Sequence, residues 1–147
     1  MSRSSTANAA LARQTWRLMF DFLMRTAPQR TNSLGRRGLT PNDSRALASL
    51  DVQEGRPMGL LAEEWKCDAS NATWIVDRLE RFGLAERHTV PHDRRVKLVK
   101  LTPKGFKTKT ELMEEFYEAP AELVELNRSD LEALRRTLQK LLRSPSV

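Results

Sequence analysis

The stretch "LLAEEWKCDASNATWIVDRLERFGLAERHTVPHDRRVKLVKLTPKG", residues 60–105, carries the pattern that decides the fold. Residues 59–66, "GLLAEEWK", predict a short helix. A second helix is expected from about Ala69 to Phe82, where apolar side chains recur at helical spacing and Gly83 follows as a C-cap. Because a tight turn at "CDAS" joins the two helices, we expect a helix-turn-helix.

A basic hairpin is expected directly after these helices. Residues 84–90 predict one strand, and residues 96–101 predict another, in which apolar side chains alternate with lysines. The turn between them is expected at Pro91, His92 and Asp93. A basic hairpin behind a helix-turn-helix is a wing, so the central module is predicted to be a winged helix-turn-helix.

On the N-terminal side of this module, the sequence predicts two further helices. The first runs from about Asn8 to Ala27, and residues 28–39, "PQRTNSLGRRGL", are expected to form a loop. The second starts in "TPNDSRALASL", with Thr40 as N-cap and Asp43 completing a capping box. "EGRPM", residues 54–58, is expected to form a turn and a short extended piece.

On the C-terminal side, Thr102 and Pro103 begin a long helix that Pro120 interrupts. A last helix is expected near Ser129, with Glu132 completing its capping box. The first and last helices both carry wide apolar stripes: Leu11, Trp16, Leu18, Met19, Phe20, Phe22 and Leu23 in one, and Leu131, Leu134, Leu138, Leu141 and Leu142 in the other. A small subunit has little use for so much apolar surface in its own core, so a partner subunit is expected to cover it.

The expected fold is therefore mainly α with a small β wing. We interpret residues 1–147 as one subunit in which a winged helix-turn-helix module, residues 39–105, binds DNA. Residues 8–38 form the N-terminal dimerisation helix and loop, and residues 106–147 form the C-terminal dimerisation helices.

Charge is unevenly distributed along the chain. The net charge is +6, and residues 78–109 hold ten basic residues against three acids, whereas residues 111–132 hold eight acids and one arginine. A basic middle favours an anionic partner such as nucleic acid. The single cysteine, Cys67, allows no intrachain disulfide and fits a cytoplasmic location, and no stretch is long and apolar enough to span a bilayer.

The helix over residues 69–82 has a polar face suited to reading DNA. Ser70, Asn71 and Thr73 supply short polar groups near its N-terminus, and Arg78 supplies a cation for guanine or phosphate. Asp77 is expected to orient Arg78 or Arg81. Trp74 lies on the same face, where an indole could pack on a thymine methyl or a sugar edge. The alternative is an ordinary amphipathic helix with a solvated face.

The wing offers a second contact with DNA. Arg95 at the hairpin tip could enter a narrow minor groove, with Asp93 fixing its side chain and Arg94 reaching phosphate. The alternative is a solvated turn with an unimportant ion pair.

Residues 60–105 resemble the MarR family of bacterial transcriptional regulators. The matching features are the Leu-Ala of the short helix, the Ser-x-x-Thr that opens the next helix, "VDRLERFGL", the "DRR" of the wing and the closing "LTPKG". The flanking helices match by pattern only. Two positions depart from the family: Lys66 replaces a frequent glycine in the turn, and Trp74 replaces a small or basic residue.

The resemblance implies a homodimer with two winged modules on a palindromic operator. Family members often repress, and many respond to small aromatic or anionic ligands or to oxidants. Trp16, Phe20 and Met24 could line an effector pocket, although dimer core is the stronger interpretation of these side chains. Cys67 is expected to be a core residue of the turn rather than a redox sensor.

We therefore predict a sequence-specific DNA-binding transcriptional regulator, a repressor released by a small-molecule effector. The alternative is a winged-helix protein-interaction module that anchors a partner protein through Trp74. An enzyme is not expected, because no nucleophile with its base and no phosphate-cradling glycine loop is present. No cofactor is expected, and His88 and His92 lack a chelating arrangement for a metal.

Overall fold

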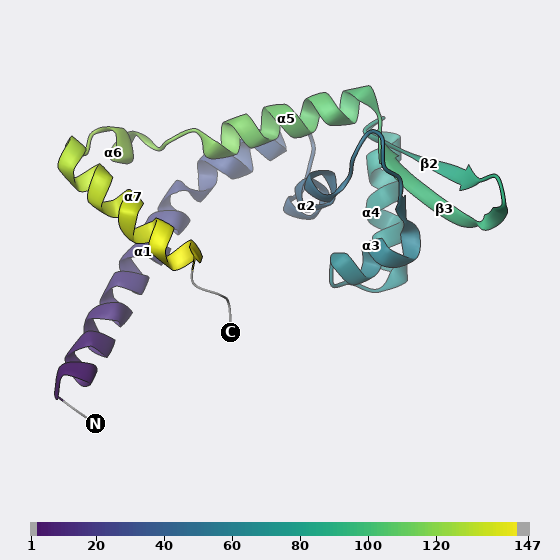
Figure 1. The fold of residues 1–147 in the computed structure, drawn as a ribbon. Coiled ribbons are helices and arrows are strands. Elements are labelled where there is room, and N and C mark those ends of the chain that lie inside the picture. The colour runs from purple at the N-terminus through teal and green to yellow at the C-terminus, as the bar shows by residue number, and fades with distance from the viewer. Residues whose placement is uncertain (1–2, 144–147) are drawn as a thin grey trace. The chain divides into compact units, whose positions relative to one another are not determined.

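The structure is a computed structural model that describes residues 3–143. The helices are α1 (Arg3–Gly35), α2 (Pro41–Ser49), α3 (Met58–Glu64), α4 (Ala69–Arg81), α5 (Pro103–Tyr117), α6 (Ala121–Val124) and α7 (Arg128–Arg143). The strands are β1 (Arg56–Pro57), β2 (Ala85–Val90) and β3 (Asp93–Leu101), as Figure 1 shows. The chain forms two compact units, one ending at Phe116 and one beginning at Tyr117. The expectation of a mainly helical chain with a small β wing is confirmed.

Helix α1 is longer than expected. It continues through Pro28 to Gly35, so the predicted loop over residues 28–39 is wrong for most of its length. Proline removes one backbone donor, but side chains still supply bonds to the turn before it: Arg30 donates to the Leu23 carbonyl at 2.9 Å. The chain leaves the helix only beyond Gly35, and Gly38 adopts a φ of 67° in the turn that follows.

The helix boundaries of the central module follow their capping residues. Thr40 and Asp43 form the expected capping box of α2, and Asp68 caps α4 by accepting from the Asn71 N–H at 2.7 Å. Gly83 ends α4 with a φ of 70°. Lys66, between α3 and α4, has a φ of 52°, so the turn does use the left-handed conformation for which glycine is the usual residue.

The wing belongs to a three-stranded antiparallel sheet with the order β1-β3-β2. Ala85 pairs with Leu101 at one end of the hairpin, and a bulge lies at Thr89 and Val90 near its tip. Asp93 pairs with Val90 and opens β3, so it belongs to the strand and not to the turn as expected. The hairpin thus carries Asp93, Arg94 and Arg95 at its outer end.

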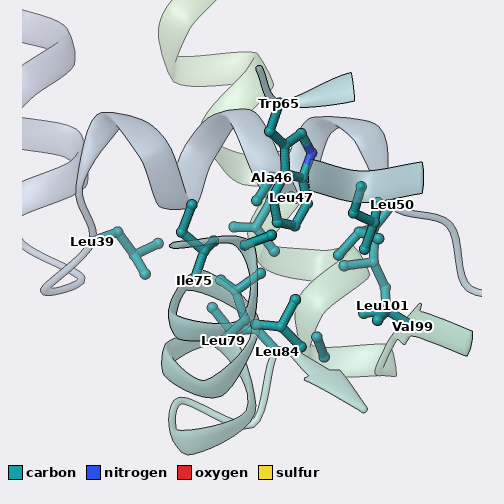
Figure 2. Packing of buried hydrophobic residues seen from close by; sticks show 14 of the residues in the cluster. Leu39, Ala46, Leu47, Leu50, Trp65, Ile75, Leu79, Leu84, Val99 and Leu101 are labelled. Atoms are coloured by element: carbon teal, nitrogen blue, oxygen red, sulfur yellow. The ribbon is translucent and has the colours of Figure 1, made fainter. Parts of the chain in front are cut away.

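One apolar core holds the central module together. Its members, drawn in part in Figure 2, come from the end of α1, from α2 to α5 and the segments beside them, and from both long strands: Leu34, Leu39, Ala46, Leu47, Leu50, Leu61, Trp65, Ala72, Ile75, Val76, Leu79, Leu84, Ala85, Val99, Leu101 and Leu112. Trp65 also donates its indole N–H to Ser49 at 2.9 Å. Gly105 in α5 passes so close to the Leu84 carbonyl oxygen that an added Cβ would lie 1.8 Å from it. The core therefore fixes α4 and the base of the wing relative to each other.

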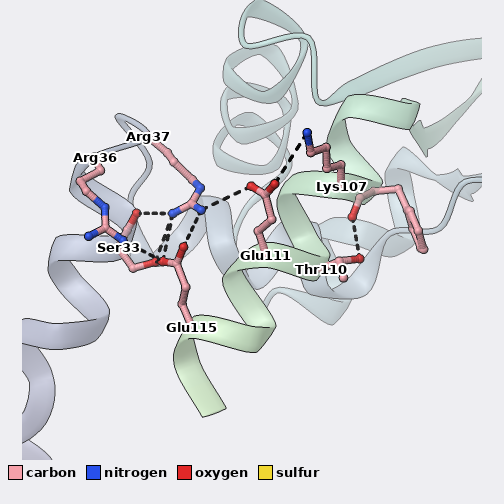
Figure 3. A network of polar contacts seen from close by, with 8 residues as sticks. Ser33, Arg36, Arg37, Lys107, Thr110, Glu111 and Glu115 are labelled. Atoms are coloured by element: carbon pink, nitrogen blue, oxygen red, sulfur yellow. Dashed lines mark hydrogen bonds and ion pairs between the residues drawn. The ribbon is translucent and has the colours of Figure 1, made fainter. Parts of the chain in front are cut away.

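An ionic network joins the end of α1 to α5 (Figure 3). Arg37 contacts Glu115 at 2.7 Å and Glu111 at 3.4 Å, and the buried Ser33 hydroxyl also bonds to Glu115. Arg36 completes the network from a more exposed position. Hydrogen bonds from Arg37 and Ser33 lower the pKa of the Glu115 carboxyl to about 2.

The second unit contains α6 and α7. Helix α7 begins at Arg128, and its N-terminal cap is Asn127, whose side chain accepts from the Asp130 N–H at 2.9 Å. The expected capping box with Glu132 is wrong, since Glu132 pairs with Arg128 instead. Leu141 and Leu142 of the predicted leucine seam are largely exposed. The C-terminal part of the apolar face of α7 is therefore left uncovered within this unit, whereas Leu131 and Leu138 are partly buried.

Candidate nucleic-acid interface

Helix α4 presents the expected polar face. Ser70, Asn71, Thr73 and Trp74 are all exposed, while the opposite face lies in the core. The Ser70 hydroxyl donates to Asp68 at 2.8 Å and the Thr73 hydroxyl to the Ala69 carbonyl at 2.9 Å. Both hydroxyls keep an acceptor lone pair for a base or phosphate group.

The N-terminus of α4 already holds a carboxylate. Hydrogen bonds from the Asn71 N–H and the Ser70 hydroxyl lower the pKa of the Asp68 carboxyl, so this side chain stays ionised at neutral pH. A DNA phosphate at this end would have to approach beside that charge. The exposed side chains of Ser70, Asn71 and Thr73, more than the helix N-terminus itself, are therefore the groups available to DNA.

Arg78 lies elsewhere than expected. Its Nη2 donates to Asp43 Oδ2 at 2.9 Å, and its Nε donates to Asp43 Oδ1 at 3.3 Å. The Asp43 side chain is fully buried and the Arg78 side chain is 18% exposed. Because its donors are directed into the protein, Arg78 lacks a free edge for guanine, and we revise its assignment as a base-reading cation.

Burial alone would raise the pKa of the Asp43 carboxyl. Hydrogen bonds from Arg78 and from the N–H and hydroxyl of Thr40 outweigh that effect and hold the pKa below its ordinary value. The bond to Asp43 likewise raises the pKa of the Arg78 guanidinium. Both groups are therefore charged at any pH at which the protein would bind DNA.

The indole of Trp74 lies against Arg78. Trp74 is 49% exposed, and the Arg78 guanidinium carbon lies 5.1 Å from the centre of its ring. The same carbon lies 5.5 Å from the centre of the Phe82 ring. The three side chains, spaced four residues apart, form a stack along one side of α4.

Arg87 ties the wing to α4, a role that the sequence did not reveal. It donates from β2 to Asp77 at 2.7 Å and to Glu80 at 2.6 Å. The expectation that Asp77 orients Arg78 or Arg81 is therefore wrong, because its partner comes from the next element. The only signal in the sequence was the spacing of two acids, three residues apart, which places them on one face of the helix.

The tip of the wing is exposed and basic. Asp93, Arg94 and Arg95 are all exposed, and Asp93 Oδ1 accepts from the backbone N–H of Arg95 at 3.0 Å. Asp93 thus shapes the backbone and does not hold the Arg95 side chain as expected. Within residues 3–143, neither guanidinium of the wing tip forms an ion pair, so both are free to meet an anion.

Trp16, Phe20 and Met24 lie on α1 with at least half of each side chain exposed. The rings of Trp16 and Phe20 are 6.5 Å apart. Two cavities described in the structure are lined by other residues. A cavity of about 220 Å³ adjoins Leu39, Phe82 and Lys104, and one of about 300 Å³ adjoins Leu34, Arg45 and Phe116. The assignment of an effector site to α1 stays a prediction.

Residues 3–143 contain neither a cluster of potential metal ligands nor a helix suited to a membrane. No group of three or more potential metal ligands lies together in this part of the chain, and His88 pairs with Glu86 at 2.8 Å. None of its helices is long and apolar enough to cross a membrane. Cys67 is half-buried and packs against the core.

Residues 37–96 match the family model described as the MarR family. The YusO protein from Bacillus subtilis is similar in structure, with 23% identity, a TM-score of 0.79 and coverage of 99% of this chain and 100% of that one. A multiple antibiotic-resistance repressor from Listeria monocytogenes has 21% identity, a TM-score of 0.74 and coverage of 97% and 100%. The S. aureus MepR–DNA complex has 21% identity, a TM-score of 0.63 and coverage of 85% and 96%. No curated protein sequence matches this chain.

Proposed function

We propose that the chain is a member of the MarR family, whose model matches residues 37–96, and that it is a sequence-specific DNA-binding transcriptional regulator. The observation that carries the proposal is the division of charge in that module. Arg78 of α4 and Arg87 of β2 form internal ion pairs, whereas the polar face of α4 and the wing tip stay open. A surface that keeps polar readers and free cations together suits a DNA duplex.

Helix α4 is proposed to enter the major groove. Ser70, Asn71 and Thr73 reach base edges or phosphates there, and Trp74 makes apolar contact with a thymine methyl or a sugar edge. Arg95 of the wing enters the adjacent minor groove, and Arg94 contacts phosphate. The S. aureus relative in complex with DNA supports this use of the fold.

The regulator is proposed to act as a homodimer on a palindromic operator. Large apolar side chains on α1, such as Leu18 and Leu23, and on α7, such as Leu142, are at least half exposed in the single chain. Covering them with a second copy removes this apolar surface from water. A chain truncated before Arg128 loses the whole face of α7, and sedimentation should then report monomer. A stable truncated dimer would contradict the assignment of α7.

We further propose that the protein represses transcription in the cytoplasm and is released by a small aromatic or anionic effector. The Listeria relative, itself described as a repressor, supports the direction of control. Trp16, Phe20 and Met24 are candidates for the effector site or for the dimer core, and dimer core is favoured because they share the exposed stripe of α1. No catalytic reaction and no cofactor is assigned.

The direct test is selection of bound sites from genomic DNA followed by titration of the selected duplex. We expect a palindromic site and an affinity that falls steeply with salt. Absence of DNA binding at low salt would overturn the proposal and favour the alternative, a winged-helix module that binds a partner protein.

A single variant tests the wing. Arg95→Ala should cost about 1–3 kcal/mol in operator binding and leave the dimer intact. Arg128→Ala is the matched control, because it removes the same charge from an exposed site in α7. Equal affinities of the two variants would remove the wing from the interface.

A further inference from the structure

The stack on α4 suggests how Trp74 is held. The Arg78 guanidinium is bound along its edge: Asp43 accepts two hydrogen bonds from it, and the Gly38 carbonyl accepts a third at 3.3 Å. Asp43 is fully buried and belongs to α2, so the anchor is part of the rigid core. A planar guanidinium that is fixed along its edge is fixed in orientation as well.

Two aromatic rings lie beside this guanidinium. Phe82 contributes one of them from a half-buried position, and its ring lies 3.6 Å from where a Cβ at Gly38 would be. Trp74 contributes the other from the exposed surface. The indole is therefore the outer member of a stack whose inner members are anchored.

We propose that Arg78 is a positioning residue that holds the Trp74 indole in one orientation on the DNA-facing surface and thereby sets operator selectivity. This inference rests on the proposed function. An exposed indole without such support samples several rotamers and loses that freedom on binding. An indole already fixed in the free protein contacts one arrangement of apolar base or sugar atoms, so it discriminates among sequences more sharply.

The occupant of this position is a pyrimidine methyl or a deoxyribose edge. The stack offers DNA an apolar ring surface, and the Nε and Nη2 donors of Arg78 are directed to Asp43 and the Gly38 carbonyl. In the major groove, the thymine methyl is the apolar group that distinguishes base pairs. The selectivity conferred by Trp74 is therefore expected to concern one A·T pair in each half-site.

The test uses Arg78→Lys, with Arg81→Lys as the matched control on the same helix. Lysine keeps the charge but cannot make the two-pronged bond to Asp43 and present a plane to Trp74 at the same time. The full-length protein is labelled with 5-fluorotryptophan, and the Trp74 fluorine signal is identified by Trp74→Phe. We expect Arg78→Lys to shift or broaden the Trp74 signal, while the signals of Trp16 and Trp65 stay in place.

The second readout is the ratio of affinities for the selected operator and for a random duplex of equal length. Arg78→Lys should lower this ratio about tenfold, the effect of one weakened base contact, with little change for the random duplex. Trp74→Ala should lower the ratio similarly, and the double variant no further. Arg81→Lys should leave the ratio unchanged.

An unchanged Trp74 signal in Arg78→Lys would overturn the inference. Equal losses on operator and random DNA would also overturn it, because Arg78 would then act as a phosphate contact. Should Arg78→Lys fail to fold, Asp43→Asn weakens the same anchor at equal side-chain volume, and its spectrum decides. If the wild-type protein binds no DNA, the proposed function fails, and the fluorine spectrum still reports whether Arg78 orients Trp74.

Discussion

Replacing Asp43 with alanine should destabilise the protein more than any change to a single cap. Asp43 accepts from the Thr40 N–H at 2.8 Å, closing the capping box of α2, and it neutralises Arg78 from a fully buried position. Asp43→Ala removes both interactions at once. It also leaves the Arg78 guanidinium without its counter-charge.

The magnitude follows from these two losses. A lost cap costs about 1 kcal/mol. Removing one partner of a buried ion pair costs about 3–5 kcal/mol when the other charge is trapped. The Arg78 side chain keeps 18% of its surface exposed and can turn toward water, so the lower part of that range applies. We expect Asp43→Ala to lower the free energy of unfolding by about 4 kcal/mol in total.

Urea denaturation followed by circular dichroism measures this change, at one protein concentration for all variants because a dimer's stability depends on concentration. Thr40→Ala is the control for the cap alone and should cost about 1 kcal/mol. A double-mutant cycle with Arg78→Ala should give a coupling of about 2 kcal/mol. The reasoning is refuted if Asp43→Ala costs no more than Thr40→Ala, or if the two single effects simply add.

Three further variants test other parts of the structure. Gly105→Ala should destabilise the protein by about 3 kcal/mol or more, because the added Cβ would meet the Leu84 carbonyl. The control is Gly59→Ala in α3, whose added Cβ meets nothing within 4 Å and which should stabilise the protein by about 0.5–1 kcal/mol. Equal denaturation midpoints for the two variants would contradict the close approach of Gly105 to Leu84. Glu115 has a folded pKa of about 2, below its usual 4.5, so the stability it contributes is present above pH 4.5 and lost as the pH falls toward 2. Glu115→Gln should flatten the acid limb of a stability–pH profile over that window, and an unchanged limb would argue against the Arg37 network. Lys66→Gly should raise the free energy of unfolding by about 1 kcal/mol because Lys66 has a positive φ, and Lys66→Ala, which keeps the strain, should not.

The parts of the fold that the sequence predicted are those controlled by neighbouring residues. The capping box of Thr40 and Asp43, the stop at Gly83 and the start of α5 after Thr102 each depend on residues within one turn. The apolar spacing of α4 identified the side that lies in the core. Such signals are local, so a single chain displays them without an alignment.

The predictions from the sequence that were wrong share a different cause. A proline normally ends a helix, but the last turns of α1 continue past Pro28 because the buried Ser33 and Leu34 pack against the rest of the module. The partners of Arg78 and Arg87 lie 35 and up to 10 residues away. Both arginines could be placed on a helix or strand from the sequence, but only the tertiary structure shows which carboxylates they meet.

These tertiary partners reduce the number of cations that the basic segment, residues 78–109, can offer to DNA. Of its ten basic residues, Arg78, Arg87 and Lys107 pair with acids, and Lys104 and Lys109 donate to backbone carbonyls. The other five, for which the described part of the chain shows no such bond, are Arg81, Arg94, Arg95, Lys97 and Lys100. The sequence count therefore overstates the charge available to phosphates by about a factor of two.

The salt dependence of operator binding measures that difference. Each neutralised phosphate contributes about −0.9 to the slope of log affinity against log salt. Ten cations from each of two subunits would give a slope of about −18, whereas five from each give at most about −9 from this segment. We expect a slope of about −9 or shallower, measured by fluorescence anisotropy on the selected duplex. A slope close to −18 would mean that the internal ion pairs open on DNA, and the stack that holds Trp74 would open with them.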